Sequence, residues 1–345
     1  MPIFTAGQLA SLASHIFHAA GATSDESQIV GDALVEANLE GHDSHGVVRV
    51  PEYVKWIEEK LINIGARMEV VKEAEAFAVL DGHWGWGQVV ARQGMEYAIR
   101  KVSRAGAVTI SMSQCCHIGR VGDYPMMAAR AGFAAIMFVN THGGGKLVAP
   151  WGGRERRLSA NPISIAIPRS SSPPILIDLS TCAIAGGKIT IAHHSGKSIP
   201  PGSILDADGH PSTNPADFIG PPEGALLPFG GHKGFALGLA TDILAGAFSG
   251  AGCSRPTANR VGNSFTATLL DPGQFRERGV FDQDVDRLVD YVKSSKLADG
   301  FTEILIPGEP ERRERARRER DGISVDDETW RQIRETAQRY GVNAA

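Results

Sequence analysis

One junction decides the fold that this sequence predicts: Cys116-His117-Ile118-Gly119-Arg120-Val121-Gly122-Asp123-Tyr124. The aliphatic run 107–112 before it is typical of a buried strand, and residues 124–131 after it are typical of a helix. Glycines at such a junction let backbone amides approach an anion at the helix N-terminus. Imidazole is well suited to moving a proton near neutral pH, so His117 is a candidate acid and base. Taken alone, the motif is explained equally well by a histidine that is merely hydrogen-bonded at a strand end.

Strands and helices alternate on both sides of this junction. The strand-like runs lie at 76–80, 107–112, 134–139, 163–167, 175–177 and 266–270, and helical patterns lie at 87–105 and 124–131. This alternation predicts an α/β fold, with a central mixed sheet in a domain of residues 71–274. Residues 235–248 are apolar nearly all round, so we expect that helix to be buried.

Both chain ends are predicted to be helical, and together they form a second domain of residues 1–70 plus 275–345. Thr5 and Gln8 have the spacing of a capping box, and Pro51 suits the first turn of a helix. Between residues 309 and 321, six arginines are interspersed with five acids. That pattern favours a solvated helix face with i,i+4 ion pairs over a tail that binds nucleic acid.

Composition excludes several classes of protein. The 345 residues are 42% hydrophobic and 21% charged, which excludes disorder, and 35 basic against 39 acidic residues give a net charge of −4, which argues against a nucleic-acid partner. Four cysteines, two of them adjacent, fit neither a disulfide framework nor zinc-finger spacing. No signal peptide or membrane span is evident, so we expect a soluble cytoplasmic protein. The G-x-G-x-x-G fingerprint of a Rossmann fold and the P-loop motif are both absent.

A second cluster precedes the sheet: Gly41-His42-Asp43-Ser44-His45-Gly46-Val47-Val48-Arg49-Val50-Pro51-Glu52-Tyr53. His45, Arg49 and Tyr53 are four residues apart, so one helix face could present all three to a small carboxylate, although Gly46 and Pro51 break helical regularity. Simple helix capping by the Asp43-Ser44 pair is the structural alternative. A zinc-dependent hydrolase that uses His42, His45 and His117 as ligands is the functional alternative from another class.

Single motifs are weak, but their order along the chain resembles the type 2 malate/L-lactate dehydrogenase family. The matching features are Asp43-Ser44-His45-Gly46 with Arg49, Pro51 and Tyr53; His117-x-Gly119-x-x-Gly122-x-Tyr124; Asn161-Pro162; Asp178 to Thr181; Gly187-Lys188; His232-Lys233-Gly234-Phe235; and Ile306-Pro307-Gly308-Glu309. They span positions 43 to 309, which is most of the chain.

The resemblance implies a homodimer that binds NAD or NADP without a Rossmann fold, in a mixed-sheet domain flanked by helices from both chain ends. It implies hydride transfer between the nicotinamide ring and C2 of a 2-hydroxy acid. His117 would be the acid and base, and Arg49 would hold the substrate carboxylate, with His45 also counted among the catalytic residues. Ser44, Tyr53 and His142 would complete the substrate pocket. A reductase of cyclic imino acids (ketimines) is the alternative within the same family.

The resemblance also implies which residues contact the cofactor. These are His45, Gly119, Arg120, Val121, Leu176, Ile177, Asp178, Leu179, Ser180, His232, Lys233, Asn263, Pro307, Gly308 and Glu309. Asp178 would either bind a ribose hydroxyl or orient a catalytic neighbour. The glycine-rich stretch at 141–145 leaves the 2-oxo acid open, because a wider pocket admits branched or aryl acids.

Overall fold

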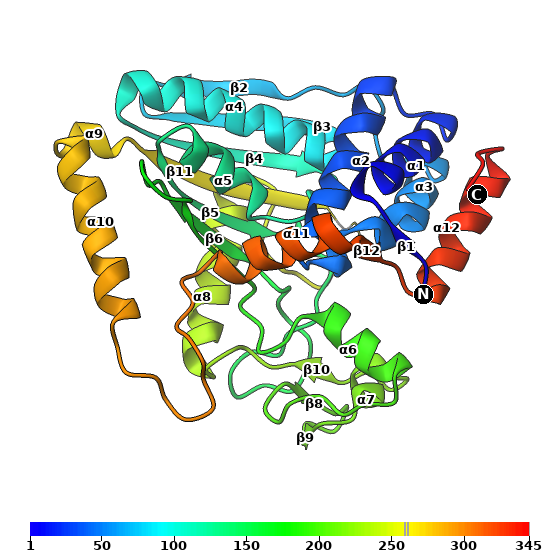
Figure 1. Ribbon diagram of the computed structural model, residues 1–345. Coiled ribbons are helices and arrows are strands. Elements are labelled where there is room, and N and C mark those ends of the chain that lie inside the picture. The colour runs from blue at the N-terminus through cyan, green and yellow to red at the C-terminus, as the bar shows by residue number, and fades with distance from the viewer. Residues whose placement is uncertain (259, 261, 345) are drawn as a thin grey trace.

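The computed structural model describes residues 1–258, 260 and 262–344, with a mixed sheet at its centre (Figure 1). The seven strands follow the order β2 (Glu69–Ala74), β3 (Phe77–Gly85), β4 (Ala107–Cys115), β11 (Asn263–Leu270), β5 (Ala134–Asn140), β6 (Ile163–Ile167) and β7 (Ile175–Leu179). β3 and β4 are parallel, and the other neighbours in this sheet are antiparallel. The predicted α/β class with a central mixed sheet is therefore confirmed. Five of the six predicted runs lie wholly within strands and the run 76–80 begins one residue before β3, whereas the charged edge strand β2 gave no signal.

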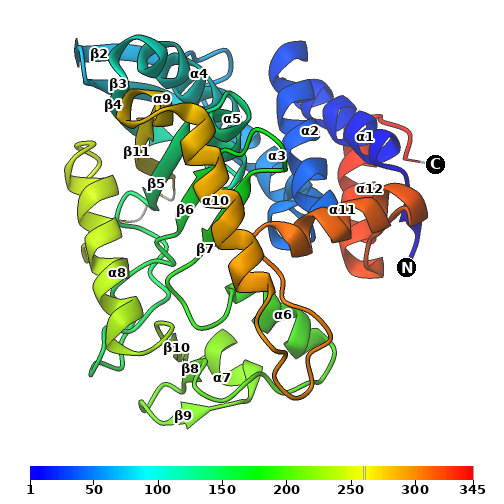
Figure 2. The same cartoon turned by 60° about the vertical axis from the view of Figure 1, so that its left-hand side comes forward.

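Helices cover both faces of the sheet. α4 (Gly87–Ala105) and α5 (Asp123–Arg130) contact the face on which Ile110 is buried. Neighbouring residues of a strand point to opposite faces, and Ser111 bonds to Thr266, whose hydroxyl donates to Leu244 O on the other side. Leu244 belongs to η3 (Ile243–Ala247), a π-helical continuation of α8 (His232–Asp242), and Figure 2 shows α8 across the sheet from α4 and α5.

A separate helical layer joins the two chain ends. It contains α1 (Ala6–Ala19), α2 (Ser24–Leu39), α3 (Val50–Glu58) and α12 (Asp327–Arg339), whose apolar faces share one core. β1 (Ile3–Phe4) pairs with β12 (Ile323–Ser324), which ties the N-terminal segment to the C-terminal one. Thr5 caps α1 in the predicted capping box with Gln8.

Two further helices lie by the sheet rather than by this helical layer. α10 (Arg278–Lys293) follows α9 (Pro272–Phe275) and stands at the left of Figure 1, away from α1 and α12. Arg278 donates to Gly132 O, and Arg169 pairs with Asp286. The two-domain division at residue 275 stays a proposal, because α10 contacts the sheet-bearing part through Arg278 and Asp286 and contacts α11 through Lys293.

The prediction that residues 235–248 form a buried helix is wrong for the isolated chain. α8 and η3 turn their small residues, such as Gly238 and Ala245, inward. The large apolar side chains point outward, and the exposed fractions are 43% for Leu237, 44% for Leu239, 45% for Ile243 and 64% for Phe248. Glycines on the inner side let the helix backbone approach the sheet closely, so burial is achieved without the large side chains.

The remaining elements lie in peripheral segments. A three-stranded sheet of β8 (Ile204–Leu205), β9 (Pro211–Ser212) and β10 (Ala225–Leu226) packs near α6 (Gly186–His194) and α7 (Pro215–Ile219). The arginine-rich segment forms α11 (Glu309–Asp321), of which no described residue is fully buried, in agreement with the prediction of a solvated face. No helix in the described part of the chain is long and apolar enough to cross a membrane.

Candidate active site

The segment between α2 and α3 is shaped by Asn38. It forms two short 3₁₀ helices, η1 (Asp43–His45) and η2 (Val47–Arg49). The Asn38 side chain accepts a hydrogen bond from Val47 N at 2.9 Å and donates to Asp43 Oδ1 at 2.6 Å. A Cβ on Gly46 would lie 2.3 Å from Asn38 Oδ1, so only glycine fits at this approach. The break in helical regularity at Gly46 is therefore what brings this segment onto α2.

An arginine of α11 also holds this segment. Arg318 Nη2 donates to Asp43 Oδ2 at 2.9 Å, Nη1 donates to the other carboxylate oxygen, and Nη1 also reaches Asn38 O at 2.8 Å. The Arg318 side chain is 11% exposed. Sequence reasoning gave the arginines of α11 no part in the site, because an alternation of arginine and glutamate does not indicate which arginine turns inward.

Two of the predicted residues contact His117, and a third contacts one of these two. Tyr53 Oη lies 2.6 Å from His117 Nδ1, and the His45 ring is stacked on the His117 ring with centroids 5.6 Å apart. Ser44 Oγ lies 3.1 Å from His45 Nδ1. Within the described residues His117 Nδ1 is hydrogen-bonded to Tyr53, and no hydrogen bond reaches Nε2.

Arg49 supplies the positive charge of this cluster. Its Nε donates to Ser44 O at 2.8 Å and its Nη1 pairs with Glu52 at 2.6 Å. Burial lowers the pKa of His117 well below its usual range, and the nearby Arg49 charge lowers it further. Burial, followed by the same charge, lowers the pKa of His45 to about 4. Both imidazoles are therefore neutral at pH 7 in the free protein.

Buried amides hold the backbone that carries His117. Ile118 N donates to Asn263 Oδ1, and Asn263 Nδ2 donates to Asn140 O, both at 2.9 Å. His142 accepts from Gln114 N at 3.0 Å, and burial lowers its pKa to about 4. The structure thus places Asn263 and His142 behind the end of β4, where they fix the position of the strand; their predicted ligand contacts stay predictions.

The turn after His117 contains a buried ion-pair network. Arg120, with its side chain 3% exposed, pairs with Glu40 at 2.6 Å and Asp123 at 2.8 Å. Asp178 Oδ2 accepts from Gly122 N at 2.9 Å and lies 3.8 Å from Arg120 Nε. Burial raises the pKa of Asp178, and it raises that of Asp123 to about 7 although Arg120 opposes the shift. The Arg120 guanidinium predicted to contact a cofactor is therefore engaged with protein carboxylates.

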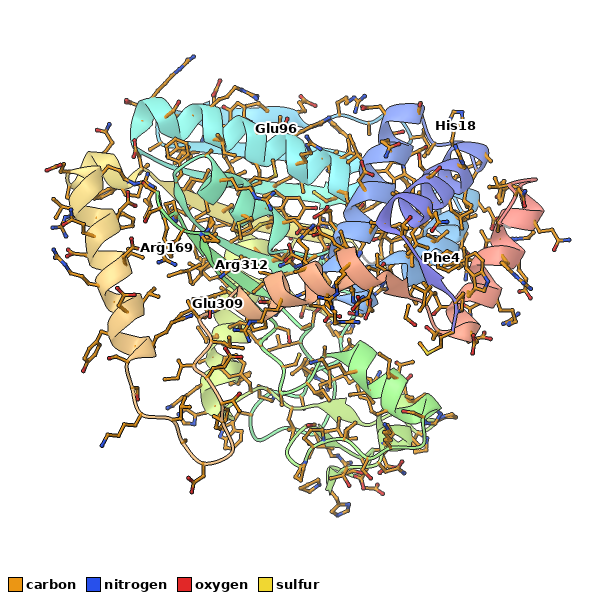
Figure 3. The ribbon with its side chains drawn as sticks, in the orientation of Figure 1. Phe4, His18, Glu96, Arg169, Glu309 and Arg312 are labelled. Carbon is orange, nitrogen blue, oxygen red and sulfur yellow. The ribbon has the colours of Figure 1, made fainter. Side chains whose placement is uncertain are left out.

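The other predicted cofactor residues form two groups. Leu176 N donates to Pro307 O at 3.3 Å, so the β7 segment from Leu176 to Ser180 and the 307–309 turn are neighbours. Figure 3 shows Glu309 at the start of α11, where it accepts from Ile306 N and pairs with Lys293. His232 and Lys233 begin α8, and both are exposed.

Two site residues carried little or no sequence signal. A Cβ on Gly187 would lie 2.7 Å from Ser44 Cβ, which explains why the Gly187-Lys188 pair begins α6 beside the site. Gln88 was not singled out, yet its Nε2 lies 3.0 Å from Tyr53 Oη. The signal for Gln88 is indirect: a Cβ on its neighbour Gly87 would lie 2.2 Å from His117 O, so α4 must start against the His117 backbone.

The zinc hydrolase alternative lacks a ligand set. Among the residues that the structure describes, no group of three or more His, Cys, Asp and Glu side chains could hold a metal ion. His45 and His117 face one another as stacked rings rather than pointing their nitrogens at one centre.

Known proteins resemble this chain over nearly its whole length. A model of the malate/L-lactate dehydrogenase family matches residues 4–334. Hydroxycarboxylate dehydrogenase B of Escherichia coli (strain K12) is 36% identical over an alignment of 344 residues, and the alignment covers 98% of this chain and 94% of the relative. The motifs at 41–45, 117–120 and 232–234 predict this likeness within the family, and the match confirms it.

Two solved structures share the fold of this chain over nearly its whole length. Sulfolactate dehydrogenase from Methanocaldococcus jannaschii has a TM-score of 0.89 at 34% identity, with 99% of this chain and 98% of that chain covered. Delta1-piperideine-2-carboxylate reductase from Pseudomonas syringae pvar. tomato has a TM-score of 0.84 at 28% identity, with 98% and 100% covered.

Proposed function

The chain belongs to the malate/L-lactate dehydrogenase family of hydroxy acid oxidoreductases, and from this premise we propose that it interconverts a 2-hydroxy carboxylic acid and its 2-oxo acid, with NAD or NADP as hydride carrier. The observation that carries the proposal is the state of His117. Its Nδ1 is held by Tyr53, its Nε2 is available, and its pKa is low enough for it to act as a base at neutral pH.

The role of His117 follows from the charge that moves. When hydride leaves C2 of the hydroxy acid, the hydroxyl proton must leave as well, and His117 Nε2 accepts it. In the reverse direction the imidazolium returns that proton to the forming alkoxide. A proton acceptor positioned in this way contributes on the order of 10²- to 10⁴-fold to the rate.

Arg49 would hold the substrate carboxylate. Its Nε and Nη1 already bond to Ser44 O and Glu52, so Nη2 and the Ser44 hydroxyl are the groups we assign to the substrate. Burial is the main cause of the low His117 pKa, and the anion would neutralise the Arg49 charge, which lowers that pKa further. Substrate binding therefore makes His117 a better proton acceptor at the moment the proton arrives.

The cofactor supplies the nicotinamide ring that accepts or donates hydride. The start of α8 fits a diphosphate, because exposed Lys233 and the N-terminal amides follow Gly230 and Gly231, which both have left-handed φ angles. Of the Asp178 oxygens, Oδ2 is bonded to Gly122 N, and we assign Oδ1 to a ribose hydroxyl. Together with the 176–180 and 307–309 segments, these residues are our proposed cofactor site.

We further propose a homodimer, with the exposed apolar face of α8 as its contact surface. Leu237, Leu239, Ile243 and Phe248 are 43% to 64% exposed in the single chain, and a second copy would remove them from water. A cytoplasmic location is proposed as well, since all four cysteines are free thiols.

Reduction of a cyclic imino acid is the second candidate, because the fold also matches that of the piperideine-2-carboxylate reductase. It would use the same carboxylate grip and the same proton donor on a C=N bond. The two candidates differ only in the atom that is protonated, nitrogen in place of oxygen.

One experiment tests both candidates. The purified protein is assayed for NADH and NADPH oxidation against pyruvate, oxaloacetate, hydroxypyruvate, phenylpyruvate and a cyclic imino acid. Turnover of an oxo acid supports the dehydrogenase and identifies the preferred cofactor, and turnover of the imino acid alone moves the assignment to the reductase. No turnover with either cofactor would refute the proposal.

A further inference from the structure

We propose that Gln88 is a positioning residue that sets the tautomer of His117 through the hydroxyl of Tyr53. The inference rests on the proposed function in one respect, namely that His117 Nε2 must accept a proton from the substrate. The contacts that carry it come from α4 and α3, two helices that belong to different layers of the fold.

Gln88, Tyr53 and His117 form one hydrogen-bonded chain. Gln88 is 2% exposed and Tyr53 is 1% exposed, so water does not compete for these bonds. Gln88 Nε2 lies 3.0 Å from Tyr53 Oη, and Tyr53 Oη lies 2.6 Å from His117 Nδ1. Gln88 Oε1 is buried and has no hydrogen-bond partner among the described residues.

The packing holds this chain in place. Tyr53 lies among aromatic rings, with centroid distances of 5.2 Å to Trp56, 5.9 Å to Trp86 and 6.2 Å to Phe17. Gly87 permits the contact between α4 and the His117 backbone, which puts the first turn of α4 beside Tyr53. The phenol therefore has few conformations open to it, and the direction of its O–H bond depends on the groups at its two sides.

The protons along the chain decide what His117 can do. A phenol has one proton to donate. If the Gln88 amide donates N–H to Tyr53, the phenol proton points at Nδ1, and neutral His117 then carries its own proton on Nε2. A histidine in that tautomer has no lone pair on Nε2 and cannot accept the proton of a hydroxy acid.

A half-turn of the Gln88 amide reverses every bond in the chain. Its Oε1 then accepts from Tyr53, and Tyr53 accepts from His117 Nδ1–H, which leaves the Nε2 lone pair free. Amide oxygen and nitrogen are nearly the same size, so either orientation fits the space and the hydrogen-bond network decides between them. The half-turn gives Oε1 a donor and takes from Nε2 its acceptor, so the Tyr53–His117 end of the chain, rather than the count of satisfied amide atoms, decides the orientation.

This arrangement serves both directions of the reaction. The proton moves only between the substrate oxygen and Nε2, while Nδ1 keeps its proton throughout. Tyr53 and Gln88 therefore need not rearrange during turnover. Arg49 and His45, the charged and titratable groups that act on His117, affect its charge state, whereas neither is bonded to Nδ1.

The first test observes the tautomer directly. ¹⁵N-histidine is incorporated into the full-length protein, and the His117 signals are assigned with His117→Asn. The wild type is expected to show the Nδ1–H form, and Gln88→Met is expected to shift His117 to the Nε2–H form because methionine offers no acceptor of comparable strength. The matched control is Gln93→Met, on the same helix, where the amide oxygen accepts from Met68 N at 2.9 Å.

Two results of this test would overturn the proposal. One is a wild type already in the Nε2–H form, and the other is a Gln88→Met variant that has the tautomer of the Gln93→Met control. Neither result depends on turnover, so the inference and the proposed function fail separately. A wild type that reduces no substrate of the panel refutes the function, whatever the tautomer.

Kinetics provide the second test. Gln88→Met should lower kcat for hydroxy acid oxidation by on the order of 10²-fold, the lower end of what a positioned proton acceptor contributes, with KM little changed. Gln88→Glu keeps an acceptor oxygen, so it should retain more kcat than Gln88→Met and shift the kcat–pH profile upward. Tyr53→Phe combined with Gln88→Met should be no worse than either single change, because both break one chain. Additive losses would mean that Gln88 and Tyr53 act independently, which would refute the proposal that Gln88 acts through Tyr53.

Discussion

Replacing Arg318 with methionine should loosen the segment that carries Ser44, His45 and Arg49 without touching any residue that contacts substrate. Arg318 comes from α11, far along the chain, and its guanidinium bonds to both oxygens of Asp43 and to Asn38 O. Methionine keeps most of the aliphatic stem and removes the charge and the donors. Asp43 then retains only its bond from Asn38 Nδ2 among the contacts described above.

The free energy lost in Arg318→Met depends on how exposed the side chains of Arg318 and Asp43 are. Removing one partner of a fully buried ion pair costs about 3–5 kcal/mol, whereas exposed pairs contribute about 0–1 kcal/mol. Arg318 is 11% exposed and Asp43 is 46% exposed, which places this pair between the two cases. We therefore expect a loss of about 1–2 kcal/mol in the local opening free energy, or about 5- to 30-fold in the opening equilibrium.

Hydrogen exchange measures that opening equilibrium directly. The amides of His45, Gly46, Val47 and Arg49 are hydrogen-bonded, so peptides that cover residues 41–49 should exchange about tenfold faster in Arg318→Met. The control is Arg317→Met, its neighbour, which is 51% exposed and bonds to Glu314 alone among the described residues.

Equal exchange of this segment in the Arg318→Met variant and its control would refute the reasoning. It would mean that Asn38 alone holds the segment and that the ion pair with α11 contributes nothing to its order. Faster exchange along the whole of α11 as well would indicate that the helix itself had come loose, and the comparison would then be repeated with Asp43→Asn, which removes the charge from the other side.

Three more predictions concern the site and one concerns the assembly. His117→Ala should reduce turnover by on the order of 10²-fold or more while a nicotinamide cofactor still quenches protein fluorescence, and unchanged turnover would remove His117 from the mechanism. Arg49→Lys should raise KM for the acid more than it lowers kcat, because a point charge replaces a planar fork; an unaltered KM would count against the carboxylate grip. The His142 pKa falls from 6.5 to about 4 on folding, so its stabilising contribution is present above pH 6.5 and is lost as the pH falls from 6.5 to 4. The slope of unfolding free energy against pH in that window should accordingly drop by up to about 1.4 kcal/mol per pH unit in His142→Gln, measured by urea titration. Ile243→Asp should give a monomer in sedimentation if α8 is the dimer contact, and a retained dimer would place the contact elsewhere.

The sequence groups His45, Tyr53 and His117, and the structure brings these side chains together, because the proposed catalytic centre is built around a local junction. His117 lies where a strand becomes a helix, and that change of periodicity is visible in the order of the residues. The partners of His117 are less predictable the further they lie along the chain. Tyr53 belongs to a recognisable motif, but Gln88 is defined only by the contact of Gly87 with the His117 backbone, which no local pattern encodes.

The misjudged helix 235–248 has a different cause. A helix pattern that is apolar all round indicates that the helix is shielded from water, but it does not indicate which part of the protein, or which other chain, covers it. In α8 and η3, Gly238 and Ala245 face inward, and Asp242 bonds to Asn140 and to Ser254 N, so the inner side is fixed by small and polar residues. Four large apolar side chains, Leu237, Leu239, Ile243 and Phe248, remain 43% to 64% exposed in the single chain. A helix with glycine and aspartate inside and leucine, isoleucine and phenylalanine outside is therefore not a core helix of the single chain, and this distribution is the basis of the dimer contact proposed above.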